Sequence, residues 1–379
     1  MKIAATGFVY DGLEAPPHQK SCAFTNVYLS QDNTLYVSGR WGSERDSLDG
    51  HPCLFTSSDF GDTWEKRHDG HGQWDWDGKL GENKCLVCTE LTPGELTATS
   101  LLVDRSHRDR PFINPLTQGL LPMRVIHSRS ADGGRTWAPP RTMDTSPHVA
   151  ASTCTHAIIR LAGDVLVQPY EHWKEYDDPA PGVPAARLRY SYDGGETWPE
   201  FTTVAQHPDN RLAYWDQRLA VHPQTGQLVA MFWTHDFVAG KDIDIHLSWG
   251  SADGHEWSVP QPTALPGQHC QPLALGGDRL LAAYSHRGDP PGIALSISED
   301  FGQTWDRAQD LLAYDSTLGT ESGAGDSRSQ ADLWNDMEKW RFGHPPAVLL
   351  PDGEVFLVYY AGDDEIKSAR WARVSLDHD

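Results

Sequence analysis

The sequence predicts an all-β chain folded as a six-bladed β-propeller, a ring of four-stranded antiparallel blades. A turn motif recurs five times along the chain, and a second hairpin signal recurs six times in alternation with it. No segment shows long helical periodicity. The 379 residues would suit two or three average domains, but the repeats predict one domain over residues 1–379.

Composition excludes several classes of protein. The chain has 15 Trp, a hydrophobic fraction of 39% and a formal net charge of −22. This apolar content excludes a disordered chain. The negative charge argues against a nucleic-acid partner or an anionic membrane surface. Because no apolar run is long enough to cross a bilayer, we expect no membrane partner.

The first repeat has the form Ser-x-Asp-x-Gly-x-Thr-Trp, an Asp box. Its copies occupy residues 57–64, 130–137, 191–198, 251–257 (a shortened copy) and 298–305. In such a turn the Asp side chain accepts hydrogen bonds from nearby backbone N–H groups, and Gly supplies a positive φ. The Trp packs its large face beside the turn. We therefore assign these Asp and Trp residues to structure and not to a functional site.

The second repeat is a short turn between two apolar strands. Its six copies begin at Asp32, Pro93, Gly163, Gly226, Gly277 and Asp352. Two hairpins per unit make four strands, so the expected blades cover residues 18–78, 85–145, 148–208, 210–263, 265–312 and 340–376. We expect residues 3–9 to close the ring by pairing with the last blade. Residues 334–340 are expected to form a helical turn in a loop.

This combination of motifs resembles the sialidase (neuraminidase) superfamily of glycan-active propellers. The resemblance rests on the Asp boxes, the six units and their order, and it covers nearly the whole chain. It implies that the boxes lie opposite the active face. It also implies that the site is lined by the starts of the inner strands and by the loops that join the second and third strands. The implied partner is a glycan or oligosaccharide substrate.

The sialidase catalytic pattern is incomplete in this sequence. Sialidases resemble one another in three carboxylate-binding Arg residues, an Asp acid and a Tyr nucleophile assisted by a Glu. The position of the first Arg holds Ala23 or its neighbours Phe24 and Thr25. His344 stands at the position of the Tyr and Tyr360 at that of the Glu that holds this Arg, while Arg287 is a candidate for a retained Arg. Planar Arg pairing anchors a sugar carboxylate, so the missing Arg predicts a changed sugar specificity. We therefore expect an exo-acting glycoside hydrolase with a specificity different from that of sialidases.

The predicted active face is rich in titratable and aromatic side chains. Paired carboxylates can act as acid and base on a glycosidic bond, neutral His can transfer protons near neutral pH, and Trp rings can stack on sugars. The expected catalytic residues are Asp46, Asp49, Glu171, Asp216, His344 and Tyr360. The expected substrate-binding residues are Arg40, His156, His172, Trp173, Trp215, Arg218, His235, His269, Gln271 and Arg287.

Two other functions fit the same residues. A His base with Tyr360 as the partner acid would suit a polysaccharide lyase that cleaves a uronate by β-elimination, with Arg287 or Arg218 holding the carboxylate. A non-catalytic propeller that binds glycan or protein would carry the same repeats. Neither the sugar nor the oligomeric state follows from the sequence.

No cofactor is expected, and no metal, because tight ligand motifs are missing. The Cys85-x-x-Cys88 pair has no second pair at zinc spacing. We expect the six Cys to be reduced and buried. The apolar stretch at the N-terminus is too short for a secretory signal, which predicts a cytoplasmic protein, with an exported form that has lost its leader as the alternative.

Overall fold

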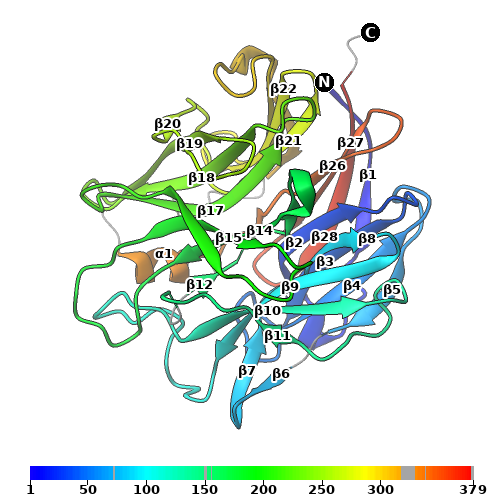
Figure 1. Cartoon of the computed structure of the whole chain (residues 1–379). Helices are drawn as coiled ribbons and strands as arrows, with labels where there is room; N and C mark the ends of the chain where they lie inside the picture. The colour runs from blue at the N-terminus through cyan, green and yellow to red at the C-terminus, as the bar shows by residue number, and fades with distance from the viewer. Residues whose placement is uncertain (71–72, 149–151, 155, 317–328, 338, 377–379) are drawn as a thin grey trace.

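The chain folds as a propeller-like ring of antiparallel sheets (Figure 1). The computed structural model describes residues 1–70, 73–148, 152–154, 156–316, 329–337 and 339–376. Within these ranges nearly all regular structure is β-structure, as the repeats predict. None of the helices described there is long and apolar enough to span a bilayer.

The strands follow the order of the two repeats. The first half of the chain contains β1 (Lys2–Tyr10), β2 (Ser21–Leu29), β3 (Leu35–Gly42), β4 (His51–Ser57), β5 (Glu65–Asp69), β6 (Gln73–Trp76), β7 (Lys79–Asn83), β8 (Val87–Thr92), β9 (Glu95–Asp104), β10 (Met123–Ser130), β11 (Arg141–Thr142), β12 (Ser152–Thr153), β13 (Ile159–Arg160), β14 (Leu166–His172) and β15 (Ala185–Ser191). The second half contains β16 (Glu200–Ala205), β17 (Leu212–Val221), β18 (Leu228–Asp236), β19 (Lys241–Gly250), β20 (Gln261–Pro262), β21 (Cys270–Gly276), β22 (Arg279–His286), β23 (Gly292–Ser298), β24 (Leu311–Asp315), β25 (Phe342–Gly343), β26 (Ala347–Leu349), β27 (Val355–Gly362) and β28 (Lys367–Ser375).

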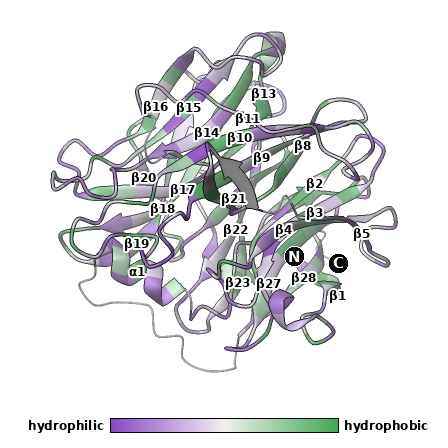
Figure 2. Ribbon diagram, turned by 90° about the horizontal axis from the view of Figure 1, so that it is seen from below, coloured by the Kyte–Doolittle hydropathy of each residue, from purple (hydrophilic) through white to green (hydrophobic). Residues whose placement is uncertain are grey.

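Helices are few and short in the described ranges. They are α1 (Gln330–Met337) and the 3-10 helices η1 (Pro17–Gln19), η2 (Ala162–Asp164) and η3 (Arg307–Gln309). The helix α1 begins four residues before the turn predicted over 334–340 and ends within it. Strands β14, β17 and β21 lie near the centre of the ring in Figure 2, whereas β5, β16 and β20 lie at its edge.

Hydrogen bonds group the strands of the described ranges into five sheets. Four of them follow single stretches of chain, namely β6–β11, β12–β16, β17–β20 and β21–β24. The fifth has nine strands, because the parallel pair Ser21–Lys367 joins β2–β5 to β25–β28. Five sheets therefore stand where the repeats predict six blades.

The two ends of the chain meet in the nine-stranded sheet. Strand β1 pairs antiparallel with β28 from Lys2–Ser375 to Tyr10–Ala369, as predicted for residues 3–9 (Figure 1). Without β1, the outer edge of β28 would present unpaired N–H and C=O groups to solvent. The N-terminal strand therefore covers an edge that the last strand would otherwise leave open.

The Asp boxes form the predicted turns. In the first box, Asp59 Oδ1 accepts from the backbone N–H of Thr63 at 2.9 Å, and Oδ2 accepts from the Thr63 hydroxyl at 2.5 Å. Trp64 Nε1 donates to the Gly61 carbonyl at 3.1 Å, and Gly61 has a φ of 105° that favours glycine. The same bonds to Thr recur at Asp132, Asp193 and Asp300, while Asp253 of the shortened box accepts from a backbone N–H.

Candidate functional site

One deep pocket collects side chains from several sheets and from α1. Its cavity volume is about 150 Å³. Its polar lining consists of Asn26, Arg45, Lys84, Thr153, Glu171, Asp216, Arg218, Gln268, His269, Ser285, Arg287, Gln330 and His344.

Half of the predicted site residues line this pocket. They are Glu171, Trp173, Trp215, Asp216, Arg218, His269, Arg287 and His344. They come from the end of β14, from the middle of β17, from the chain around the start of β21, and from the loops after β22 and β25. These are the places where a propeller gathers functional groups at one mouth.

Two carboxylates face the pocket from neighbouring sheets. Glu171 lies near the end of β14, and its Oε1 accepts from the backbone N–H of Gln217 at 2.9 Å. Asp216 lies in β17, where the pairing with β18 shifts register and Asp216 has a φ of 49°. Such a bulge re-aims a side chain, and here it presents Asp216 to the pocket beside Glu171.

Burial sets the protonation of this pair. Loss of hydration, together with the negative charge of Asp216, raises the pKa of Glu171 to about 8. Burial also raises the pKa of Asp216, although the nearby Arg218 and Arg45 oppose this effect. The pair therefore holds a proton at neutral pH, which is the state a general acid requires.

Arginines from different sheets meet in the pocket. Arg218 is 3% exposed, and its Nη1 lies 3.4 Å from Asn26 Oδ1. The guanidinium of Arg45 lies 4.9 Å from the ring centre of Phe24. Arg287 lies 4.1 Å over the Trp340 ring. These stacked and buried positions suit guanidinium groups, which are weakly hydrated.

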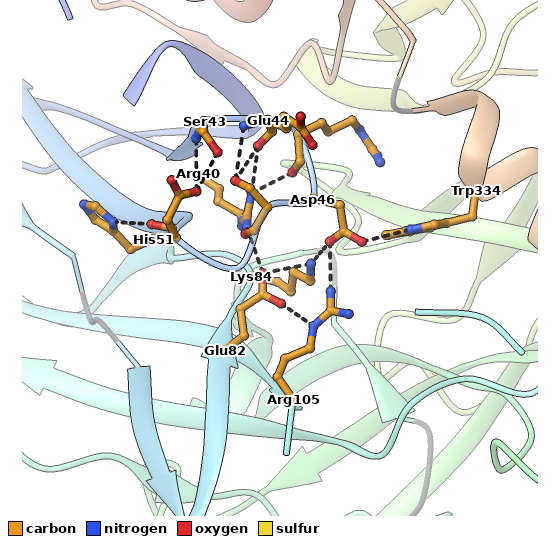
Figure 3. A network of polar contacts seen from close by, with 12 residues as sticks. Arg40, Ser43, Glu44, Asp46, His51, Glu82, Lys84, Arg105 and Trp334 are labelled. Atoms are coloured by element: carbon orange, nitrogen blue, oxygen red, sulfur yellow. Dashed lines mark hydrogen bonds and ion pairs between the residues drawn. The ribbon is translucent and has the colours of Figure 1, made fainter. Parts of the chain in front are cut away.

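A buried ion network supports one wall of the pocket (Figure 3). It contains Arg40, Asp46, Glu82, Lys84 and Arg105. Glu82 lies 2.8 Å from both Arg40 Nη2 and Lys84 Nζ. Asp46 pairs with Lys84 and accepts from the indole N–H of Trp334 at 3.2 Å. The network therefore ties the 43–50 loop to β7 and α1, with Lys84 on the pocket side.

The charges around the pocket sum to a positive interior. The ion network has three cations (Arg40, Lys84 and Arg105) and two anions (Asp46 and Glu82). The pocket wall carries three more positive charges, on Arg45, Arg218 and Arg287. Glu171 and Asp216 are the carboxylates that offset them, and burial raises the pKa of both. In a chain with a formal charge of −22, this local excess of positive charge favours an anionic ligand group.

Two histidines lie at the arginine-rich side of the pocket. The rings of His269 and His344 have centroids 4.4 Å apart. Both ring nitrogens of His269, which is 3% exposed, lack a hydrogen-bond partner among the described residues. Burial and the charge of Arg218 hold the pKa of both imidazoles well below the usual value. They are therefore neutral near pH 7.

Tryptophans form a continuous apolar wall. Trp173 packs on Trp215 at 5.4 Å, Trp215 on Trp233 at 5.0 Å, and Trp233 on Trp340 at 5.6 Å between ring centroids. Trp334 of α1 stacks on Phe112 at 4.2 Å. These rings offer the flat apolar surface that sugar rings use in stacking.

Several predicted residues lie behind the lining or away from it. Arg40 is fully buried in the ion network, and Asp46 lies behind Lys84 and Trp334. Tyr360 is fully buried, with its ring centroid 6.2 Å from that of His344. Asp49 is exposed and accepts from the backbone N–H and the hydroxyl of Ser43 at 3.1 Å.

The remaining predicted residues contact other parts of the chain. His172 packs on His148 at 4.6 Å, and His235 Nδ1 lies 2.8 Å from Asp242 Oδ1. Gln271 donates to the carbonyl of Pro272 at 2.8 Å, and His156 Nδ1 lies 3.0 Å from the carbonyl of Ala157. Placement at a strand end brought these residues near the mouth, but their side chains do not line the pocket.

The pocket also contains residues that the sequence reasoning missed. They are Phe24, Arg45, Lys84, Cys85, Cys154, Trp233, Trp334 and Trp340 among others. Trp334 and Trp340 lie outside every Asp box. This was the sequence signal that could have placed the segment containing α1 at the pocket. The thiols of Cys85 and Cys154 contact each other at the pocket wall, and all six cysteines are free and buried, as expected.

Comparison with known proteins identifies the family. Residues 111–357 match the model of a family described as a BNR repeat-like domain. The chain belongs to this family. Among curated protein sequences, none matches the chain.

Solved structures share the fold of this BNR repeat-like protein. A protein of unknown function from Dyadobacter fermentans has a TM-score of 0.74 at 16% identity, covering 99% of both chains. The Hadza microbial sialidase Hz136 has a TM-score of 0.64 at 15% identity, covering 98% of this chain and 68% of its own. An intramolecular trans-sialidase from Ruminococcus gnavus, solved with oseltamivir carboxylate, has a TM-score of 0.63 at 12% identity, covering 98% and 97%. At these identities the likeness establishes the fold.

Proposed function

We propose that this BNR repeat-like protein is a carbohydrate-active enzyme, an exo-acting glycoside hydrolase that removes a terminal residue from a glycan. The observation that carries the proposal is the pair Glu171 and Asp216 in a Trp-walled pocket. A hydrolase needs a protonated acid beside the scissile bond and a second carboxylate for the developing positive charge or for water. The raised pKa of Glu171 suits the acid, and Asp216 is the second carboxylate.

We propose that the sugar removed carries an anionic group. Arg45, Arg218 and Arg287 approach the pocket from separate parts of the fold, and planar guanidinium groups pair well with carboxylates. Arg218 lies within β17 and Arg287 directly follows β22, and the sialidase resemblance places both positions at the mouth. Arg45 comes from the 43–50 loop, whereas the first Arg of a sialidase would stand at the position of Ala23. The three arginines of this pocket therefore come from positions that differ from those of the sialidase set. Specificity is therefore proposed to differ from that of sialidases.

The proposal includes a six-bladed, sialidase-like ring. The nine-stranded sheet would be two blades, β2–β5 and β25–β28 with β1, that meet at the single pair Ser21–Lys367. Each proposed blade contains one copy of the second hairpin repeat. Counted in this way, the blades surround the pocket, and the Asp boxes belong to the opposite face.

A lyase is the second candidate because two neutral histidines line the pocket. His269 or His344 could remove the proton next to a uronate carboxylate held by Arg218, and a β-elimination would follow. Tyr360, the expected partner acid, lies behind His344 and is fully buried. Since burial raises the pKa of both carboxyl groups at the pocket, Glu171 and Asp216, hydrolysis is the better-supported reaction.

Product analysis tests the proposal. The protein is incubated with neutral, sialylated and uronate-terminated oligosaccharides, and the products are measured by mass spectrometry. Hydrolysis adds one water and releases the terminal sugar, whereas elimination leaves an unsaturated uronate. We expect Glu171→Gln and Asp216→Asn to lose turnover, and Asp49→Asn, which changes an exposed carboxylate outside the pocket, to keep it.

Three outcomes would contradict the hydrolase. An unsaturated product would favour the lyase. Glycan binding without product from any substrate would favour a non-catalytic propeller. Full turnover in both Glu171→Gln and Asp216→Asn would remove the carboxylate pair from the mechanism.

A further inference from the structure

A second polar cluster lies outside the pocket, on the outer strands β4 and β5. His51 and Cys53 are two residues apart on β4 and so share a face. Asp69 ends β5 and pairs directly with Cys53. The candidate ligand atoms of these three side chains all lie within 4.8 Å of one another. Strand register alone therefore brings a nitrogen, a sulfur and an oxygen donor together.

The spacing of these donors is close to that of a tetrahedral metal site. Asp69 Oδ1 lies 3.1 Å from His51 Nε2 and 3.1 Å from Cys53 Sγ. Ligands of zinc at about 2.0–2.3 Å from the metal are roughly 3.3–3.8 Å apart in a tetrahedron. A small outward movement of the side chains would admit the ion, and Asp69 is exposed enough to provide an entry path.

A fourth donor is within reach on η1. The side-chain amide of Gln19 lies 3.3 Å from His51 Nε2 and 3.2 Å from Asp69 Oδ1 through its Nε2. Rotation of the amide by half a turn would present its oxygen, which is a metal ligand, but would break the bonds that this oxygen accepts from Lys66 Nζ at 3.2 Å and from the Tyr10 hydroxyl at 3.3 Å. A water molecule can take the fourth place without that loss. Gln19 is 4% exposed, so it is held in place over the cluster.

The second nitrogen of His51 shows why a cation suits this position. His51 Nδ1 lies 3.2 Å from the carbonyl oxygen of Asp49. A carbonyl only accepts, so Nδ1 carries a proton. In the neutral imidazole, Nε2 is then an acceptor that faces the Asp69 carboxylate, which is also an acceptor. A metal cation between them would relieve this contact, as would a proton on Nε2 that makes the pair a salt bridge, and the Nδ1–carbonyl bond is the usual support of a metal-bound His.

We propose that His51, Cys53 and Asp69 bind a zinc ion, with the Gln19 side-chain oxygen or a water as the fourth ligand. A set of one imidazole, one thiolate and one carboxylate matches zinc better than calcium or magnesium. On binding, the Cys53 thiol releases its proton to solvent and bonds as thiolate, with no change of oxidation state. Lys66 Nζ, 3.1 Å from Asp69 Oδ2, can keep that contact because the other carboxylate oxygen faces the site.

The proposed ion would stabilise the wall of the pocket from outside. His51 is the first residue of β4 and follows the 43–50 loop (Figure 3). That loop carries Arg45 to the pocket and Asp46 to the ion network. Anchoring His51 to β5 and η1 therefore fixes the far end of the loop. Because the ligands come from three elements and none of them lines the pocket, the site is structural.

Cobalt substitution tests the site through its colour. The full chain is stripped with a chelator and titrated with Co²⁺, which gives thiolate charge-transfer and tetrahedral visible bands when bound by Cys. We expect saturation at one equivalent and loss of both bands when Zn²⁺ is added. The charge-transfer band should disappear in Cys53→Ser and remain in Cys270→Ser, a matched change of a buried cysteine in another sheet. Asp69→Asn should weaken Co²⁺ binding at least about tenfold, because it removes a charged ligand.

The experiment still gives a decisive result if one variant does not fold. Asp69 is 55% exposed at its side chain, so Asp69→Asn leaves the core intact if Cys53→Ser disrupts it. The absence of a thiolate band in the wild-type protein overturns the proposal. So does a band that persists unchanged in Cys53→Ser, or a Co²⁺ affinity that is equal in the wild type, Asp69→Asn and His51→Ala.

Discussion

Replacing Glu171 by Gln tests the raised pKa on which the proposed acid depends. Burial and the charge of Asp216 raise the pKa of Glu171 from its ordinary value of about 4.5 to about 8. One pKa unit corresponds to about 1.4 kcal/mol, so ionising this group costs roughly 5 kcal/mol more in the folded protein than in the unfolded chain. The Gln side chain keeps an oxygen for the N–H of Gln217 but cannot ionise, so the variant removes that cost.

The sign of the effect follows from proton binding. Between about pH 4.5 and about pH 8 the unfolded chain releases the proton of Glu171 while the folded protein retains it. Stability from this group is therefore complete below the unfolded pKa and falls as the pH rises toward the folded pKa. We expect Glu171→Gln to gain stability relative to the wild type across this range, by up to roughly 5 kcal/mol. Because Asp216 is coupled to Glu171, the measured change belongs to the pair.

Thermal unfolding from about pH 5 to about pH 9 measures this difference. The control is Asp59→Asn in the first Asp box, where hydrogen bonds from Thr63 lower the pKa of Asp59 to about 2. That carboxylate is ionised in both states throughout the range, so the difference between the control and the wild type should be flat. If the curve for Glu171→Gln is equally flat, the raised pKa and the acid role derived from it are wrong.

Four further results are expected. The proposed hydrolysis should lose kcat/KM above about pH 8, approaching tenfold per pH unit, because Glu171 must be protonated. Trp334→Ala removes a ring that stacks on Phe112, and calorimetry should show a dissociation constant for the glycan that is about tenfold higher. In kinetic assays the same variant should raise KM more than it lowers kcat. Arg218→Met should reduce binding of an anionic sugar at least about 100-fold and that of its neutral analogue much less. Asp132→Ala should lower the free energy of unfolding by about 1–3 kcal/mol, measured by denaturant titration, while turnover is unchanged, because its turn lies away from the pocket.

The repeats made much of the fold predictable because the interactions behind them are local. Each Asp box joins an Asp to a Thr four residues later, as Asp59 joins Thr63, so the turn forms from neighbouring residues. The second repeat marks the hairpins β2–β3, β8–β9, β13–β14, β17–β18, β21–β22 and β26–β27. Pairing of residues 3–9 with the last strand followed from the need to cover a sheet edge.

The candidate site was only partly predictable because side-chain direction is a finer property than strand position. Glu171 and His172 are adjacent on β14, and neighbours on a strand point to opposite faces. Both were expected at the mouth, but Glu171 lines the pocket and His172 packs on His148. The bulge at Asp216 changes the alternation again. Hydropathy alone does not reveal which face of each strand turns inward.

The sequence by itself determined the repeated turns, the β-rich class and the concentration of charge and Trp at strand ends, because spacing and composition encode short-range interactions. The tertiary structure decided which side chains from those strand ends meet in one site. It brought Arg45 and Trp334, nearly three hundred residues apart in the chain, to a ring-to-cation distance of 5.1 Å, and it placed Asp69 opposite Cys53 through one strand register. Contacts of this kind depend on how the ring closes, and closure is a property of the whole chain.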